Sequence, residues 1–444
     1  MTDVKRRAFR GEILHLVDDP ATADTKAHEH WSDGLLVVAD GRVERCGDAS
    51  ALLSDTGALD IVDCRGKLIV PGFIDAHVHY PQTDVIAAYG EKLLEWLTRY
   101  TFPVERRFAD AAHARDVADF FIAELLRNGT TTAAVFATVH PESVDAFFAS
   151  AQAQGARMIA GKVMMDRNCP PELCDTAEGA YDDSKALIER WHGRDRLSYA
   201  VTPRFAPTST ERQLELAGRL LDEHQGLYLQ SHVAESADEV NWVGQLYPWS
   251  RSYLDVYDHF GLLRERAIYA HCLHLDDTDR ARMGATGAAM AFCPTSNLFL
   301  GSGLFDLDAA RKHGVAVAVG TDIGGGTSFS MLRTLDEAYK VAQLLHHRLS
   351  PLGALYLATL GGARALHLDE RIGNFAIGKE ADFVVMDAAA TPLLARRMKS
   401  TQTIEERLFA LIMLGDDRCV FETYLMGERR HARDGEVAAR RSSG

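Results

Sequence analysis

The middle of the chain alternates short apolar runs with longer stretches that mix apolar and polar residues. This alternation is typical of β-strands that are each followed by an amphipathic helix, and it predicts a parallel sheet built from βα units. Eight such apolar runs lie near residues 68–79, 130–140, 157–165, 197–205, 227–232, 267–271, 288–294 and 315–322. Eight units spread over about 250 residues are typical of a closed barrel, so the pattern predicts an α/β fold with a (β/α)8 TIM-type barrel.

Short strand-like runs separated by turns flank this region on both sides. They read "EILHLV" and "LLVVADGRVERCG" before it, and "ADFVVMD" and "CVFETYLMGERR" after it. We expect these runs to pair into one small β-sandwich domain formed from both chain ends. The predicted domains are residues 1–67 for the N-terminal part of the small β domain, 68–375 for the catalytic barrel, and 376–444 for the C-terminal part and tail.

Composition and charge indicate which kinds of binding partner to expect. Of the 444 residues, 47% are hydrophobic and 25% are charged, which suits a large globular domain with a smaller one. No run approaches the about 18 to 20 apolar residues of a membrane span, and the first residues lack the apolar core of a signal peptide, so we expect a cytoplasmic location and no membrane partner. The formal net charge of −15 argues against a nucleic-acid partner, because phosphate backbones require basic surfaces. A small molecule is the expected ligand.

Seven cysteines are scattered along the chain, and no two of them have CxxC spacing. An odd number without a metal-binding or redox spacing predicts reduced thiols, in keeping with the expected compartment.

Metal-capable side chains stand where several of the apolar runs end. Alternate residues of a strand face the same side, so His77 and His79 at the end of the first run can bind one metal ion together. The fifth run ends at His232, the sixth at His271 and the eighth at Asp322. Because the carboxyl ends of barrel strands share the rim on which active sites are built, these five side chains should converge.

This constellation resembles the amidohydrolase superfamily, which has an HxH motif on the first strand, histidines ending the fifth and sixth strands, and an aspartate ending the eighth. Superfamily members with two metals usually bridge them with a lysine on the fourth strand, and the fourth run here has none. Lys162 lies within the third run, where a structural role or a buried carboxylate partner explains it better. The resemblance therefore implies one divalent metal, with zinc expected from the imidazole-rich ligand set, held by His77, His79, His232 and Asp322.

A glutamate follows the fifth run at a spacing that could bring its carboxylate to the metal. Glu235 lies three residues after His232, so a helical turn opening after the strand would bring its carboxylate over the metal. We expect Glu235 to act as general acid and base, while zinc makes hydroxide available at neutral pH. Asp322 would accept the proton that is released, and His271 would hydrogen-bond the attacked centre.

Three further segments of the sequence concern the substrate. "HYPQ" after the first strand, "PRF" at the end of the fourth, and the long run over residues 85–105 resemble the guanine deaminase family. The resemblance implies that Gln82 and Arg204 hydrogen-bond the purine edge while Phe205 stacks on the ring. A guanidinium has only donors and suits the O6 acceptor of guanine, and Phe205 offers an apolar face to a flat ring. The resemblance thus implies zinc-dependent conversion of guanine to xanthine and ammonia in purine catabolism, by a homodimer.

Other interpretations remain open at this stage. A related aminohydrolase could act on another heterocycle, such as an adenosine-derived thioether or an s-triazine. A non-catalytic assembly relative would be expected to have lost metal ligands, and here the set is complete. His140 begins an HxE pattern of the cytidine-deaminase type, which also needs a PCxxC motif, but the chain has no Pro-Cys pair. The glycines at 324–326 either bring the backbone close to a ligand or merely permit a turn.

Overall fold

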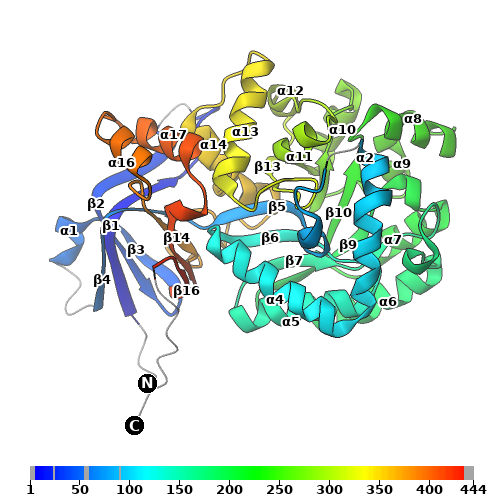
Figure 1. Cartoon of the computed structure of the whole chain (residues 1–444), viewed down its shortest axis with the longest axis horizontal. Coiled ribbons are helices and arrows are strands. Elements are labelled where there is room, and N and C mark those ends of the chain that lie inside the picture. Colours follow the sequence, from blue (N-terminus) through cyan, green and yellow to red (C-terminus); the bar gives the residue numbers. More distant parts are fainter. Residues whose placement is uncertain (1–5, 24–25, 55–59, 90–91, 435–444) are drawn as a thin grey trace, which may run out of the picture.

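The barrel is built from one parallel sheet, which Figure 1 shows surrounded by helices and beside the small sheet. The computed structural model describes residues 6–23, 26–54, 60–89 and 92–434. The eight barrel strands, each parallel to its neighbours, are β5 (Phe73–His79), β6 (Thr130–Phe136), β7 (Arg157–Gly161), β9 (Leu197–Pro203), β10 (Tyr228–Val233), β11 (Ala267–His271), β12 (Ala289–Phe292) and β13 (Val317–Val319). A short strand, β8 (Val163–Met164), pairs with β9 beside this path. The predicted barrel is therefore confirmed.

Small residues fill the barrel interior. One apolar cluster draws members from all eight strands, and most of them are alanines, such as Ala134 of β6, Ala200 of β9 and Ala318 of β13. Inward-facing residues alternate with outward-facing ones along each barrel strand. Larger side chains such as Phe73 and Met158 belong instead to the cluster that packs the strands against the surrounding helices.

Helices surround the barrel and begin at side chains that cap them. Asp110 and Thr210 accept hydrogen bonds from the first backbone N–H groups of α4 and α7, and Ser236 forms a capping box with Glu239 in α8. None of the helices in the described part of the chain has the length and apolarity that a membrane span requires. The α-helices are α1 (Ala49–Leu53), α2 (Leu93–Trp96), α3 (Phe102–Glu105), α4 (Ala111–Arg127), α5 (Pro141–Gln154), α6 (Ala177–Trp191), α7 (Glu211–Glu223), α8 (Ala237–Leu246), α9 (Tyr253–His259), α10 (Asp277–Thr286), α11 (Pro294–Phe299), α12 (Leu307–Lys312), α13 (Met331–Leu344), α14 (Pro351–Leu357), α15 (Leu360–Ala365), α16 (Pro392–Met398) and α17 (Ile404–Leu414). The shorter 3₁₀ and π turns are η1 (Tyr80–Val85), η2 (Leu97–Thr101), η3 (Arg106–Ala109), η4 (Pro171–Leu173), η5 (Ala206–Thr208) and η6 (Asp417–Cys419).

A separate sheet combines strands from both chain ends, as the flanking runs predict. Figure 1 shows its blue N-terminal strands beside the orange and red C-terminal ones. Its strands, in spatial order, are β16 (Glu428–Ala432), β15 (Val420–Leu425), β14 (Phe383–Met386), β4 (Asp60–Pro71), β1 (Arg6–Leu16), β2 (His28–Ala39) and β3 (Arg42–Asp48). Rings from both ends pack in its core: the Phe383 ring centroid lies 4.8 Å from that of Phe9 and 4.5 Å from that of Tyr424. The predicted polar tail falls in residues 435–444, outside the described residues.

The chain passes from the small sheet into the barrel at Gly72. We predicted one strand near residues 68–79, and this is wrong: Leu68–Pro71 pairs antiparallel with β14, whereas β5 begins at Phe73 in the barrel. A Cβ atom on Gly72 would lie 2.1 Å from Thr131 Oγ1, so no side chain fits at the crossing. An apolar run cannot reveal such a change of partner, because both halves are buried. The division into domains at residues 67 and 375 stays a prediction.

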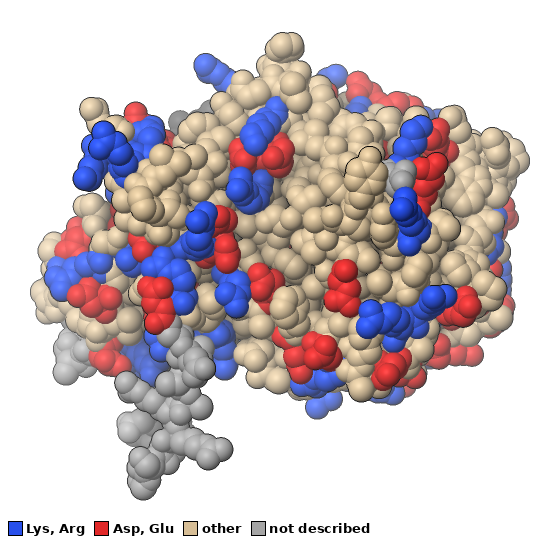
Figure 2. All heavy atoms as spheres, viewed as in Figure 1, with Lys and Arg blue, Asp and Glu red and all other residues tan. Residues whose placement is uncertain are grey.

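A buried ionic network joins the barrel to the segment that enters β14. On the face seen in Figure 2, cationic and acidic side chains are interspersed, and such exposed pairs contribute little stability. Glu380 differs, because its side chain is 2% exposed and accepts hydrogen bonds from Arg157, at the start of β7, with an Nε–Oε2 distance of 2.9 Å. Arg196 lies 2.9 Å from the same Glu380 oxygen and also pairs with Asp382. These contacts lie at the end of the barrel opposite the predicted metal site.

We predict that Glu380→Gln lowers the free energy of unfolding by about 3 kcal/mol, because two guanidinium groups would lose a buried counter-charge. Urea unfolding measures this. The matched control is Glu44→Gln, which removes a carboxylate from an Arg6 pair whose side chains are 32% and 31% exposed. The control should change stability by about 1 kcal/mol or less, and equal losses in the two variants would contradict the prediction.

The effect of Glu380 should depend on pH in a stated direction. Burial opposes its ionisation, but Arg157 and Arg196 together lower the pKa of Glu380 below its ordinary value. A carboxylate with a lowered folded-state pKa stabilises the fold above its unfolded value of about 4.3, and that contribution is lost as the pH falls through the folded-state value. The stability difference between the parent and Glu380→Gln should therefore shrink in acid.

Candidate metal centre and substrate pocket

The five side chains predicted to converge lie at or just after the carboxyl ends of barrel strands. His77 and His79 belong to β5, His232 to β10, and His271 ends β11. Asp322 follows the last residue of β13 by three positions. The chain therefore brings together, on one rim, residues that are far apart in sequence.

Two overlapping groups of these side chains could hold a metal ion: His77 with His79 and His232, and His77 with His271 and Asp322. His79 Nε2 lies 3.2 Å from His77 Nε2 and 3.1 Å from His232 Nε2. Asp322 Oδ1 lies 3.3 Å from His77 Nε2 and 3.5 Å from His79 Nε2. Four ligands arranged tetrahedrally at zinc bond lengths of about 2.0–2.1 Å would lie about 3.3 Å from one another. These four distances are close to that value.

The backbone of β5 is shaped to aim its two histidines. Asp75 pairs with Ala133 of β6 and Val78 with Val135, so Ala76 and His77 together oppose a single residue. This is a β-bulge, a feature that re-aims side chains and is common beside active sites. Strand alternation predicts that His77 and His79 share a face, but it gives no sign of the bulge.

Contacts outside the ligand set orient the imidazoles. His232 Nδ1 lies 2.7 Å from the backbone carbonyl oxygen of Arg204, which places the proton on Nδ1 and leaves Nε2 free to bind a metal. Burial lowers the pKa of His79 and of His232 well below the ordinary value, so both rings are neutral. Burial opposes the ionisation of Asp322, but the neighbouring His77 outweighs it, and the pKa of Asp322 falls to about 2. Neutral imidazoles with an ionised carboxylate are the forms that bind metal.

Two of the site residues have left-handed backbone conformations. The φ angle is +71° at His271 and +52° at Asp322. Such conformations are unfavourable for residues other than glycine and persist where surrounding structure enforces them, as at functional sites.

The glycines after Asp322 make close approaches to other parts of the chain. A Cβ atom on Gly326 would lie 1.8 Å from Thr321 O, and one on Gly324 would lie 2.7 Å from Gln82 O. Gly324 N also donates to Gln82 Oε1 at 3.1 Å, and Gly325 lines the pocket.

Glu235 lies beside the metal site, held by contacts on both carboxylate oxygens. Its Oε2 lies 3.3 Å from His271 Nε2, and Ser302 Oγ donates to its Oε1 at 3.1 Å. The predicted helical turn begins later than expected: α8 starts at Ala237, after Glu235. Sequence reasoning did not find Ser302, since no pattern marks a serine in a loop.

Burial and neighbouring charges shift the pKa values of Glu235 and His271. Burial raises the pKa of Glu235 to about 7, so this carboxyl can both take up and release a proton near neutral pH. Burial opposes the protonation of His271, but Glu235 and Asp322 outweigh it and raise the pKa of this imidazole. His271 Nδ1 lies 2.9 Å from Asn297 Oδ1 and donates to it, so Nε2 faces the two carboxylates.

One pocket collects nearly all the predicted residues. Of those residues only His77 is missing from its lining, and the apolar side chains of Leu93, Trp96, Leu97 and Leu300 complete one side of it. The predicted residues that line it are His79, Gln82, Arg204, Phe205, His232, Glu235, His271 and Asp322.

A buried glutamate that the sequence did not indicate connects two of these residues. Glu105 Oε2 lies 2.6 Å from Arg204 Nη1, and Glu105 Oε1 accepts a hydrogen bond from Gln82 Nε2 at 3.1 Å. Glu105 belongs to the run over residues 85–105 that carries a family resemblance, but nothing in that run singles it out.

Lys162 does not face the metal. Its buried ammonium group pairs with Asp175, a carboxyl whose pKa burial raises, and this agrees with the partner role expected for it. His140, the other residue left open, lies before α5 and contacts Thr138 Oγ1 at 3.1 Å.

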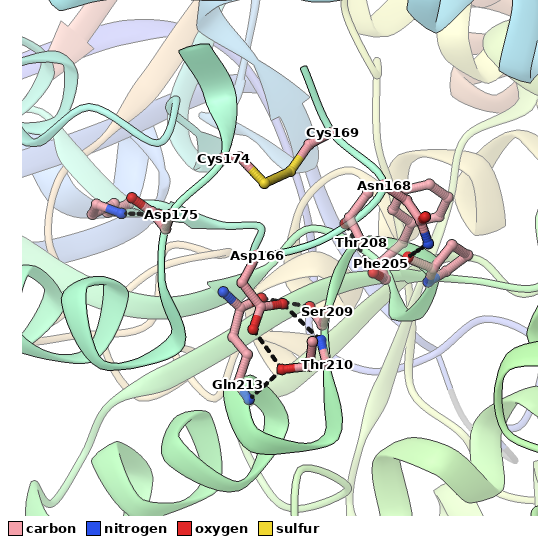
Figure 3. The surroundings of a disulfide bond; sticks show 12 residues. Asp166, Asn168, Cys169, Cys174, Asp175, Phe205, Thr208, Ser209, Thr210 and Gln213 are labelled. Atoms are coloured by element: carbon pink, nitrogen blue, oxygen red, sulfur yellow. Dashed lines mark hydrogen bonds and ion pairs between the residues drawn. A yellow bond between two sulfur atoms is a disulfide. The ribbon is translucent and has the colours of Figure 1, made fainter. Parts of the chain in front are cut away.

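A disulfide closes the loop that precedes α6, so the expectation of seven reduced thiols is wrong. Cys169 and Cys174 lie five residues apart with a Cα–Cα distance of 5.6 Å, which suits a disulfide, although their spacing matches no sequence signature. Figure 3 shows this loop beside the turn that carries Thr208 and Thr210. Asp166 accepts a hydrogen bond from Thr210 N at 2.7 Å, and Asn168 donates to Pro207 O at 2.7 Å. The loop therefore supports the chain just after Phe205.

Proteins of known family and structure are similar to this chain over most of its length. The sequence model of the Amidohydrolase family matches residues 68–429. The guanine deaminase of Escherichia coli (strain K12) is 51% identical over 96% of this chain and 98% of that protein. Its solved structure has a TM-score of 0.93 to this one.

Two further solved structures are similar over nearly the whole chain. The guanine deaminase of Bradyrhizobium japonicum is 38% identical, with a TM-score of 0.93, and covers 97% of this chain and 100% of that one. The guanine deaminase of C. acetobutylicum, with bound guanine in the active site, is 28% identical, with a TM-score of 0.88, and covers 96% of this chain and 100% of that one.

Proposed function

The chain belongs to the amidohydrolase family, and we propose that it hydrolyses guanine to xanthine and ammonia. The observation that carries the proposal is the convergence, on one pocket, of a His/Asp metal-binding site, a buried glutamate and a buried arginine. The first two provide what a hydrolytic deamination needs, and the third recognises a carbonyl group. The guanine deaminases of similar sequence and structure support the same substrate.

We propose that one zinc ion per chain occupies the site, held by His77, His79, His232 and Asp322. Three imidazoles and one carboxylate suit zinc, and Nε2 of His79 lies 3.2 Å from that of His77 and 3.1 Å from that of His232. Lys162 pairs with Asp175, so it does not supply the bridge that a second ion would need. When bound, zinc makes hydroxide available at neutral pH by lowering the pKa of water.

Proton transfer falls to the carboxyl groups beside this site. As the new C–O bond forms at the carbon that carries the amine, Glu235 delivers a proton to the neighbouring ring nitrogen. His271 and Asp322 stabilise the charge around the tetrahedral centre, and Asp322 accepts the proton released from water. The C–N bond then breaks, and the amine leaves as ammonia with a proton passed through Glu235.

The purine is held by side chains on the other side of the pocket. Arg204 donates to the O6 carbonyl, Gln82 hydrogen-bonds the ring edge, and Phe205 stacks on the ring face. In this pose the C2 amine of guanine points to Glu235 and the metal ligands. Adenine would place its own amine against the guanidinium and would bring no leaving group to the metal site.

We also propose, from the resemblance to guanine deaminases, that the protein acts in the cytoplasm as a homodimer.

Elemental analysis of the purified protein should find about one zinc per chain, and a chelator should abolish an activity that added zinc restores. His232→Ala should lose the metal, because it removes one of four ligands. Glu235→Gln is the matched control, a neighbouring polar residue outside the ligand set, and it should keep the metal. Two tightly held ions per chain would contradict the single-metal proposal.

Glu235→Gln should still bind the purine yet lose several powers of ten in turnover. Proton transfer by one positioned group commonly contributes about 10² to 10⁴ in rate, and glutamine cannot provide it. Steady-state kinetics with guanine, beside a binding measurement on the same preparation, separates the two effects. Turnover near the parent rate would mean that another residue is the acid and base.

Ammonia release from guanine should exceed that from adenine by about 10⁴ or more, because adenine leaves the buried polar groups unpaired. Arg204→Met should lower kcat/KM for guanine at least about tenfold without releasing the metal, since a hydrogen bond to a charged group contributes about 1.5 to 3 kcal/mol. Comparable rates on the two purines, or an unchanged Arg204→Met enzyme, would contradict the substrate assignment.

A further inference from the structure

We infer that Glu105 is a positioning residue that fixes both hydrogen-bond donors presented to the purine, and that it tunes the pocket for an uncharged ring with a carbonyl acceptor. The inference rests on the proposed function and deepens it. It gives a role in substrate recognition to a residue that lies outside the metal site.

The burial and contacts of Glu105 exclude a solvated role. It is the last residue of α3, and its side chain is 1% exposed. One carboxylate oxygen accepts from Arg204 Nη1 at 2.6 Å and the other from Gln82 Nε2 at 3.1 Å. A buried carboxylate needs such partners, because leaving its charge unpaired costs several kcal/mol. Both of its partners line the substrate pocket.

The contact with Gln82 determines which way its amide points. Gln82 Nε2 donates to Glu105, while Gln82 Oε1 accepts from Gly324 N at 3.1 Å. The reverse orientation would set the amide oxygen against a carboxylate and the amide nitrogen against a backbone donor. One N–H of Gln82 therefore remains for a ligand, so this residue is held as a donor.

The contact with Arg204 determines its direction and compensates its charge. The guanidinium donates to Glu105 on one side, and its Cζ lies 5.4 Å from the centre of the Phe102 ring. An unpaired buried arginine would favour a carboxylate or phosphate ligand. With Glu105 beside it, the pair carries no net charge, and a neutral carbonyl is the better acceptor. This matches a free nucleobase more closely than an anionic ligand.

The test is Glu105→Gln in the zinc-loaded enzyme. We expect KM for guanine to rise at least about tenfold while kcat changes less than about threefold, because these hydrogen bonds act alike on bound substrate and transition state. Metal content should stay at the parent level. Affinity for guanine, measured by calorimetry in a Glu235→Gln background, should fall by the same factor. The matched control is Glu95→Gln, an exposed position on α2, which should leave every quantity unchanged.

A double variant separates positioning from a purely structural role. Arg204→Met leaves Glu105 buried without its guanidinium, so adding Glu105→Gln to it should raise the melting temperature and cause little further loss of kcat/KM. This holds even where Glu105→Gln alone folds poorly, because the double variant has no unpaired buried charge. Losses that multiply independently would overturn the inference, as would parent-like KM and affinity in Glu105→Gln.

The outcome distinguishes this inference from the proposed function. If the parent releases ammonia from guanine and Glu105→Gln binds guanine as tightly as the parent, the result contradicts the role of Glu105 but not the proposed function. If the parent releases no ammonia, the proposed function falls, and the stability coupling between positions 105 and 204 still tests the pairing.

Discussion

Closure of the barrel is the constraint on which the site depends. β5 and the segment after β13 meet through two backbone hydrogen bonds, from Asp322 N to His77 O and from His79 N to Ile323 O, each 2.9 Å long. These bonds bring the carboxylate of the last barrel unit beside the imidazoles of the first, although the whole barrel separates them in sequence. The left-handed backbone at Asp322 is held in the same place. A sheet that did not close between β5 and β13 would contain all the predicted metal-binding side chains but would not bring them together.

Arg204 links the metal side of the pocket to the substrate side. Its backbone carbonyl accepts the Nδ1 proton of His232, which sets the tautomer of a predicted metal ligand. Its side chain pairs with the buried Glu105, which lies outside the metal site. The same short stretch at the end of β9 therefore orients both the ligand that binds metal and the donor proposed to bind the purine. The disulfide loop that holds the chain after Phe205 supports this stretch from outside.

Sequence patterns were sufficient wherever a residue's place follows from strand periodicity. Strand ends of a parallel barrel share one rim, so the positions of His77, His232 and Asp322 could be predicted without any contact information. Contacts made across loops could not be predicted in this way. Glu105 and Ser302 act through partners far away in sequence, and no spacing rule connects them. The crossing at Gly72 was missed for a related reason: a buried run looks the same whether its neighbours belong to one sheet or to two.

The strand order of the small sheet determines when its strands can pair during synthesis. β4 lies between β1 and β14, and β14 is made only after the entire barrel has emerged. Until residues 383–386 leave the ribosome, one edge of β4 presents unpaired backbone groups, and such an edge is a template for pairing with other chains. The edge of β4 therefore stays unpaired until β14 is made. During that interval the nascent chain is most exposed to wrong pairing with other chains. Truncation before residue 383, which removes β14, would extend this exposed state to the finished protein.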